Sequence, residues 1–138
     1  MRRHLLVLAS LALLAGMLGC GGESAREVAQ QYINDMKAGQ FKEAAMLYDY
    51  NDRARAENPD WDTFGESQRK LILDKQVPEW ATAKATTLAL WATHFTVGIK
   101  IVEFNETGDA ARATLEGGRV GAINLVKAGK TWRVKDME

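Results

Sequence analysis

The spacing of apolar residues changes once along the chain, near Phe95. Before that residue, apolar side chains recur every three or four positions, which is typical of helices with one buried face. After it, apolar and polar residues alternate, which is typical of strands with one buried face. Helices therefore come first, and strands joined by short turns follow. This order predicts an α+β domain, with the N-terminal helices packed on one face of an antiparallel sheet.

The first two predicted helices form a hairpin. Ser24 and Glu27 have the spacing of a capping box at the start of the first helix, and Gly39 is expected to end it. The second helix is expected over residues 41–48. The buried stripe of the first helix is predicted to consist of Ala25, Val28, Ala29, Tyr32, Ile33 and Met36.

Two further helices are expected after the break "ENPDWDTF". Thr63 and Glu66 have the spacing of a second capping box and predict the start of the third helix. Because proline is favoured in the first turn of a helix, we expect an interruption at Val77 and a fourth helix from Pro78 onwards. The residues expected to face inward from the fourth helix are Trp80, Ala81, Ala85, Leu88, Trp91 and Ala92.

Four strands are expected after Phe95, separated by turns at "NETGD", "GG" and "KAGK". The first carries Val97, Ile99 and Ile101 at alternating positions, and the others are expected at 111–116, 120–127 and 131–135. The face turned away from the helices has mixed charges and is predicted to be a solvated surface. Its residues are Arg112, Thr114, Glu116, Thr131, Arg133 and Lys135.

Residues 1–19 have the pattern of a secretory signal peptide. Arg2 and Arg3 precede an apolar run over residues 5–18, and the small residue Gly19 follows it. That run has 14 residues, whereas a membrane-spanning helix needs roughly 20. The whole chain has 18 basic and 18 acidic residues, so losing both arginines of the leader leaves a net charge of −2. That balance argues against a nucleic-acid partner.

The residues "MLGC" at the end of this leader resemble the lipobox of bacterial lipoproteins, although Met17 replaces the usual leucine. The resemblance implies that Cys20 carries a diacylglyceryl thioether, usually with a further acyl group such as palmitate, and becomes the first residue of the mature chain. Several acyl chains anchor a protein stably in a membrane. We therefore expect a leader over 1–19, a lipidated tether over 20–23 and a single domain over 24–138.

This resemblance also implies a location in the cell envelope. In Gram-negative lipoproteins, an aspartate after the cysteine favours the inner membrane, so Gly21 favours the periplasmic face of the outer membrane. The chain has no second cysteine, which excludes an intramolecular disulfide. The very short tether predicts that the domain lies close to the membrane surface.

The mature domain resembles the nuclear-transport-factor-2-like superfamily and small lipoproteins of unknown function with that fold. The resembling segments are "AGQFKEAAMLYD" and "GDAARATLEGG…INLVKAGKTWRVKDM", the second ending in the superfamily's pattern L-V-K-x-x-G-K-W-x-V with Thr131 inserted. The resemblance implies a cone-like domain, in which helices wrap a curved sheet and often enclose a pocket. It does not imply an activity, because folds of this kind host enzymes and non-enzymes.

Small residues leave room on the sheet surface. Ala111 and Ala113 are expected on its inward face, with Gly117, Gly118 and Gly121 nearby. Either the helices approach the sheet closely there or a cavity remains; close packing is the usual outcome in protein interiors. A cavity would be lined by Tyr32, Tyr48, Trp91, His94 and Phe95, and would suit an apolar or amphipathic ligand.

His94 is the only histidine left after removal of the leader. It could serve as a general base with a carboxylate such as Asp35 or Asp49, or it could be an ordinary core or boundary residue. No set of His and Cys residues predicts zinc. The acidic stretch "NPDWDTFGE" lacks the glycine and glutamate of a calcium loop, so no metal or other cofactor is predicted.

Three functions remain compatible with these observations. The first is a non-enzymatic, lipid-anchored envelope protein that binds a small apolar ligand or docks on another envelope component. The second is an isomerase, cyclase or hydrolase of the same fold that uses His94 with a carboxylate. The third is a structural domain that acts only through protein contacts.

Overall fold

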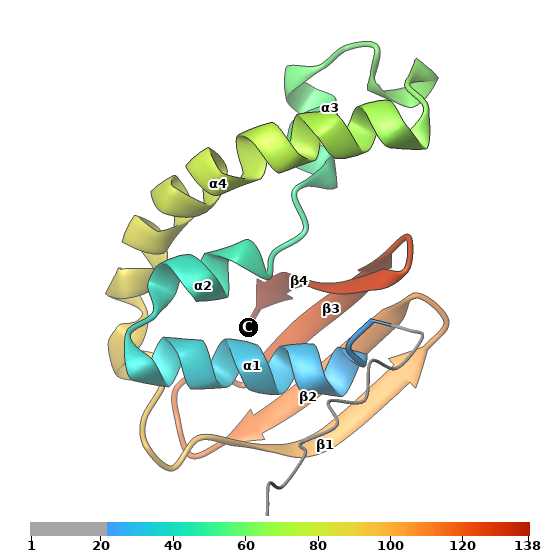
Figure 1. Cartoon of the computed structure of the whole chain (residues 1–138). Helices are drawn as coiled ribbons and strands as arrows, with labels where there is room; N and C mark the ends of the chain where they lie inside the picture. Colours follow the sequence, from blue (N-terminus) through green and yellow to red (C-terminus); the bar gives the residue numbers. More distant parts are fainter. Residues whose placement is uncertain (1–21) are drawn as a thin grey trace, which may run out of the picture.

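The computed structural model describes residues 22–138. The predicted leader and Cys20 lie outside the described residues. The α+β prediction is confirmed, because helices come first and an open, four-stranded antiparallel sheet follows (Figure 1). The elements are α1 (Ala25–Ala38), α2 (Phe41–Met46), α3 (Asn51–Glu57), η1 (Trp61–Thr63), α4 (Glu66–Leu90), η2 (Ala92–His94), β1 (Lys100–Thr107), β2 (Ala110–Glu116), β3 (Ala122–Ala128) and β4 (Thr131–Met137).

Helix α1 has the start, the end and the buried face that the sequence predicts. The Glu27 N–H donates to the Ser24 hydroxyl at 3.2 Å, and the Ser24 N–H donates to the Glu27 carboxylate at 2.9 Å, which completes the capping box. Gly39 ends the helix in the left-handed conformation. All six residues of the predicted stripe are buried in the core between α1 and the sheet.

The segment after α2 pairs with the sheet instead of continuing the helix. Helix α2 ends at Met46, two residues earlier than expected. The Val134 N–H donates to the Leu47 carbonyl at 2.7 Å, and the Asp49 N–H donates to the Val134 carbonyl at 2.8 Å. This short parallel bridge covers the outer edge of β4 and leads directly into α3, a short helix that the sequence does not predict.

The expected break at Pro78 is wrong, because α4 runs through it as one helix. Pro78 removes a hydrogen bond to the carbonyl of Asp74, a residue on an exposed turn where water can solvate that group. The second capping box is also wrong: the Thr63 hydroxyl donates to the Asp60 carbonyl at 2.7 Å, and Gly65 precedes α4 without a side-chain cap.

The end of α4 also differs from the expectation. Trp80, Ala81 and Leu88 are buried as predicted, whereas Trp91 is 42% exposed. The chain leaves the α-helix at Leu90 and continues in η2, which turns the Trp91 ring outward. No helix within residues 22–138 is both long and apolar enough to span a membrane.

The four strands follow one another in the order β1-β2-β3-β4. The first begins later than predicted, at Lys100, and Val97 is 92% exposed in the loop before it. A bulge between Ile101 and Glu103 shifts the register, so Ile101 and Phe104 both pair with buried residues of β2. The alternation of inward-facing and outward-facing side chains is therefore interrupted within β1 rather than at its start.

The outer face of the sheet is polar, as predicted, with Thr114 half-buried. Arg133 is not turned away from the helices as expected, because its guanidinium donates to the Met46 carbonyl at the end of α2. Arg112 donates to both carboxylate oxygens of Glu138, at 2.9 and 2.8 Å, and the Asn124 amide donates to the same carboxylate at 2.8 Å. The hydrogen bonds from Arg112 and then Asn124 hold the pKa of Glu138 at about 2. This cluster connects β2, β3 and the end of the chain.

Glu138→Gln should remove a pH-dependent part of the stability. The folded-state pKa of Glu138 is about 2, below its ordinary 4.5. Its contribution is therefore complete above about pH 4.5 and is lost as the pH falls through about 2. The difference in urea midpoint between wild type and variant should shrink over that range and also with added salt. Glu106→Gln is the control, because the Glu106 carboxylate is exposed and makes no hydrogen bond or ion pair within residues 22–138. A pH-independent difference for Glu138→Gln would contradict the expectation.

Candidate functional site

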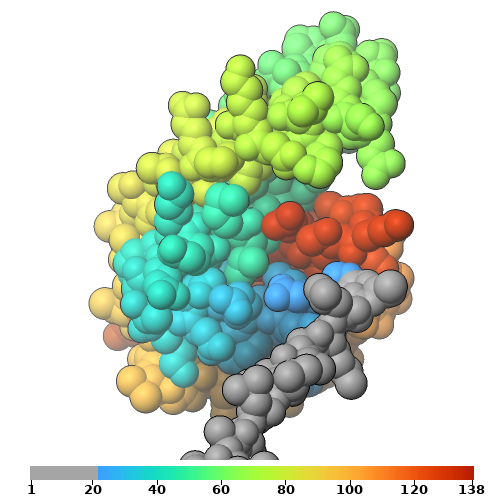
Figure 2. All heavy atoms as spheres, in the orientation of Figure 1, coloured from blue at the N-terminus to red at the C-terminus, as the bar shows by residue number. Residues whose placement is uncertain are grey.

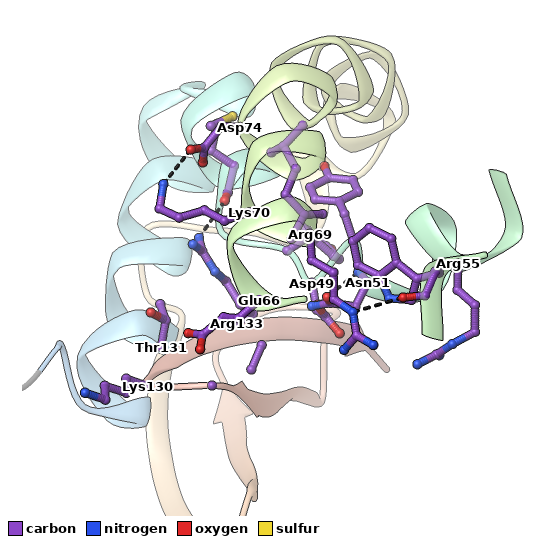
Figure 3. Close-up of a pocket in the computed structure, with 18 of the residues that line it drawn as sticks. Asp49, Asn51, Arg55, Glu66, Arg69, Lys70, Asp74, Lys130, Thr131 and Arg133 are labelled. Carbon is purple, nitrogen blue, oxygen red and sulfur yellow. Dashed lines mark hydrogen bonds and ion pairs between the residues drawn. The ribbon is translucent and has the colours of Figure 1, made fainter. Parts of the chain in front are cut away.

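An open cleft of about 970 Å³ lies between the first half of α4, with α3 and η1, and the hairpin of β3 and β4. Figure 2 shows it as a gap between the green lobe and the red hairpin. Figure 3 shows its labelled polar side chains, which come from both walls. The volume is at the upper end of the range that is usual for small-molecule sites.

The burial pattern of α4 explains why the cleft is open. The buried residues of α4 are Trp80, Ala81 and Leu88, and all of them follow Pro78. The part of the helix before Pro78 contributes only partly buried apolar residues, such as Leu73 and Val77, to the core. This first half therefore extends beyond the sheet (Figure 1), and the cleft lies beneath it.

The floor of the cleft is aromatic and apolar. Trp61 is 1% exposed, and its ring meets that of Phe64 edge to face at 6.4 Å. The Tyr50 hydroxyl donates to the Ala45 carbonyl at 2.8 Å, and burial raises the Tyr50 pKa to about 12, so this hydroxyl stays neutral. Further apolar lining comes from Met46, Leu73, Val77 and Pro78.

Cations outnumber carboxylates around this floor. The basic lining residues are Arg55, Arg69, Lys70, Lys130 and Arg133, and the acidic ones are Asp49, Glu66 and Asp74. Arg55 is paired with Asp52 and Asp62, which lie outside the lining, and Lys70 is paired with Asp74. The lining cations without an ion pair within residues 22–138 are Arg69, Lys130 and Arg133, against the carboxylates of Asp49 and Glu66. A cleft with one excess sign of charge and low-dielectric walls attracts ligands of the opposite sign.

Two of these cations, Arg69 and Arg133, are held in place by backbone carbonyls. The Arg69 guanidinium donates to the carbonyls of Trp61 and Asp62, at 3.0 and 3.1 Å, and lies over the Trp61 ring at 5.6 Å. Arg133 donates to the Met46 carbonyl at 3.1 Å. Neutral carbonyl partners leave both positive charges uncompensated, whereas Lys70 is paired with Asp74.

A smaller hollow of about 380 Å³ lies on the other side of the segment 48–50. Its lining includes Arg53, Lys84 and Lys135. The Lys84 ammonium lies 4.0 Å from the centre of the Tyr48 ring. Burial, with a smaller effect of Arg53, lowers the pKa of Lys84. Basic side chains therefore line this smaller hollow as well as the main cleft.

Of the five residues expected to line a pocket, four aromatic residues and His94, only Tyr48 lines this cleft. Tyr32, Tyr48 and Phe95 come together in the core, where the two tyrosine hydroxyls are 2.8 Å apart. The Tyr32 ring meets the other two rings edge to face, at 5.6 and 5.9 Å. Tyr32 has no exposed surface, so close packing prevails at this point.

His94 and Trp91 lie at the other end of α4, where their rings are 4.9 Å apart. Asp35 is buried in α1, accepts from the Gln31 amide at 3.0 Å and has its pKa raised by burial. Asp49 lines the cleft and accepts a hydrogen bond from Asn51. Within residues 22–138, no hydrogen bond or ion pair joins His94 to a carboxylate, and its Nδ1 atom is buried without a partner.

Apart from Tyr48 and Asp49, the residues that build the cleft were not singled out as site residues by the sequence. Leu73 and Val77 have the i, i+4 spacing of one helix face, and this signal could have extended the expected helix across Pro78. Trp61 stands in a segment that reads as a break. No group of three or more His, Cys, Asp or Glu residues in the described part of the chain is placed to hold a metal ion.

Comparison of the chain with protein-family models, with curated proteins and with solved structures finds no match.

Proposed function

We propose that this chain is a lipid-anchored, non-enzymatic protein of the cell envelope that binds a small amphipathic molecule in the cleft between α4 and the β3–β4 hairpin. The cleft is the observation that carries the proposal: an apolar floor of Trp61, Leu73 and Val77 adjoins uncompensated cations such as Arg69 and Arg133. Sites with an apolar surface and a few placed polar groups are typical of ligand-binding proteins.

The anchoring part of the proposal is supported by the leader and by Cys20. We also propose the finer fold assignment, a nuclear-transport-factor-2-like domain, which is supported by helices that precede one open antiparallel sheet. Gly21 favours the periplasmic face of the outer membrane in a Gram-negative cell. Membrane fractionation and labelling with a clickable fatty acid test the anchor. The Cys20→Ala variant should lose both its membrane association and its fatty-acid label. Normal labelling of Cys20→Ala would refute the anchor.

A photoreactive fatty acid tests the cleft directly. The full chain, reconstituted in phosphatidylcholine vesicles, is irradiated with a diazirine-bearing palmitate, and the adducts are mapped by mass spectrometry. We expect adducts on the cleft-lining segments 46–50 and 73–78. Leu73→Trp, which places a bulky ring in the cleft, should reduce them by about tenfold, equivalent to the loss of ~1.4 kcal/mol of binding.

Leu71→Trp is the matched control, because Leu71 is on the same helix, is 70% exposed and does not line the cleft. This variant should keep the adducts of the wild type. Equal losses in the two variants, or adducts only outside the cleft segments, would contradict binding in the cleft. Circular dichroism of both variants shows whether the fold is retained.

A further inference from the structure

The start of the described chain lies against the rim of the cleft. A Cβ atom placed on Gly22 would be 3.3 Å from the carbonyl oxygen of Lys130. Lys130 lies in the turn between β3 and β4 and lines the cleft. Figure 1 shows the beginning of α1 and this turn on the same side of the molecule, which is also the side towards which the first half of α4 extends.

This contact relates the cleft to the anchor. Cys20 is two residues before Gly22, and two residues of fully extended chain span at most about 7 Å. If Cys20 is lipidated, as the proposed function states, the Lys130 rim is held within a short distance of the membrane surface. The mouth of the cleft then adjoins the headgroup region, so membrane lipids are the amphiphiles present there at the highest local concentration.

The charges at this rim match a particular headgroup chemistry. The Lys130 ammonium has no hydrogen bond or ion pair within residues 22–138, and Arg133 uses only one of its nitrogens, as a donor to the Met46 carbonyl. Arginine and lysine are the usual partners of phosphate groups. Further inside, the lining becomes apolar at Leu73 and Val77. From rim to floor, the lining changes from basic to apolar. A phospholipid changes in the same way, from its anionic phosphate to its apolar acyl chain.

We propose that the cleft takes an anionic phospholipid from the leaflet that holds the anchor, with the phosphate at Lys130 and Arg133 and part of an acyl chain along Leu73, Val77 and Trp61. This inference rests on the proposed function and adds the ligand class and its source. A short anionic compound from solution would satisfy the rim and leave the apolar floor uncovered.

The test uses the full lipidated chain in phosphatidylcholine vesicles. In one set, a small fraction of the lipid is a phosphatidylglycerol with a diazirine in its acyl chain; in the other set it is a phosphatidylcholine with the same chain. We expect adducts on the segments 46–50 and 73–78 in the phosphatidylglycerol set, about fivefold more than in the phosphatidylcholine set, equivalent to the attraction of one cation near a membrane surface.

Lys130→Glu should abolish this preference, because it replaces the rim cation by a charge that repels the headgroup. Lys100→Glu is the matched control: Lys100 is an exposed lysine at the start of β1, outside the cleft lining, and its variant should keep the full preference. Both variants should still be labelled by the diazirine-bearing palmitate, because the apolar floor is unchanged.

Three outcomes would overturn the inference. Equal labelling by the two lipids would remove the selectivity, and an equal effect of the two lysine variants would remove the rim from the site. Suppression of the phosphatidylglycerol adducts by inorganic phosphate as efficiently as by unlabelled phosphatidylglycerol would assign the site to a soluble phosphate compound. In each case, palmitate adducts that Leu73→Trp removes and Leu71→Trp retains would leave the proposed function standing.

Discussion

Trp61→Ala should lower the free energy of unfolding by about 3–5 kcal/mol, the usual cost of replacing a buried tryptophan by alanine. The side chain is 1% exposed and packs against Phe64, and the Arg69 guanidinium lies over its ring at 5.6 Å from the centre. Arg69 also donates to the Trp61 carbonyl at 3.0 Å. Trp61 is therefore the main contact that fastens η1 to the first half of α4, where α4 itself has no buried residue.

Urea unfolding measures the total loss, and hydrogen exchange locates it. We expect faster exchange in α3, η1 and the first turns of α4, while the sheet amides change less, because this part of the chain before Pro78 has its own small set of apolar contacts. Trp91→Ala is the matched control: Trp91 is 42% exposed, so its loss should cost roughly 1 kcal/mol. Similar losses for the two variants would show that Trp61 does not hold the lobe.

The elements that the sequence predicts well are those whose signals are local and agree with one another. In α1, the capping residues, the apolar stripe and the final Gly39 all lie within the helix or beside it, so no distant contact is needed to interpret them. Helix α4 is different, because a local signal at Pro78 conflicts with the series Leu73, Val77 and Ala81 on one face. Packing of that face outweighs the cost of the proline, which the position of Asp74 on an exposed turn reduces.

The cleft could not be predicted in this way, because its walls are far apart in the sequence. Arg69 and Leu73 come from α4, whereas Lys130 and Arg133 come from the last hairpin. Their proximity depends on how far the first half of α4 extends beyond the sheet, and this follows from the tertiary packing of Trp61. The aromatic residues that the sequence did single out, such as Tyr32 and Phe95, instead fill the core.

The small residues at the end of β2 allow two backbone segments to touch. The loop before β1 crosses the chain at Gly117 and Gly118, and the Arg119 N–H donates to the His94 carbonyl at 3.1 Å. A Cβ atom on Gly118 would lie 2.5 Å from that carbonyl oxygen. The sequence left open whether the helices approach the sheet here or a cavity remains. The structure shows that a loop, and not a helix, packs closely against these glycines, backbone on backbone.

Gly117→Ala should therefore destabilise the protein by about 3 kcal/mol, more than the conformational cost alone. The residue has φ +88°, and a Cβ atom would lie 2.3 Å from the Gly98 carbonyl oxygen. The left-handed conformation costs alanine about 1 kcal/mol, and forcing two backbone segments apart costs about 2 kcal/mol more. Gly108→Ala isolates the first cost, because Gly108 has φ +60° and no atom within 4 Å of its Cβ position. Urea midpoints of the two variants give the difference directly. Equal losses would mean that the loop at 95–99 yields without cost, so that the contact with Gly117 does not fix the path of the chain from α4 into the sheet.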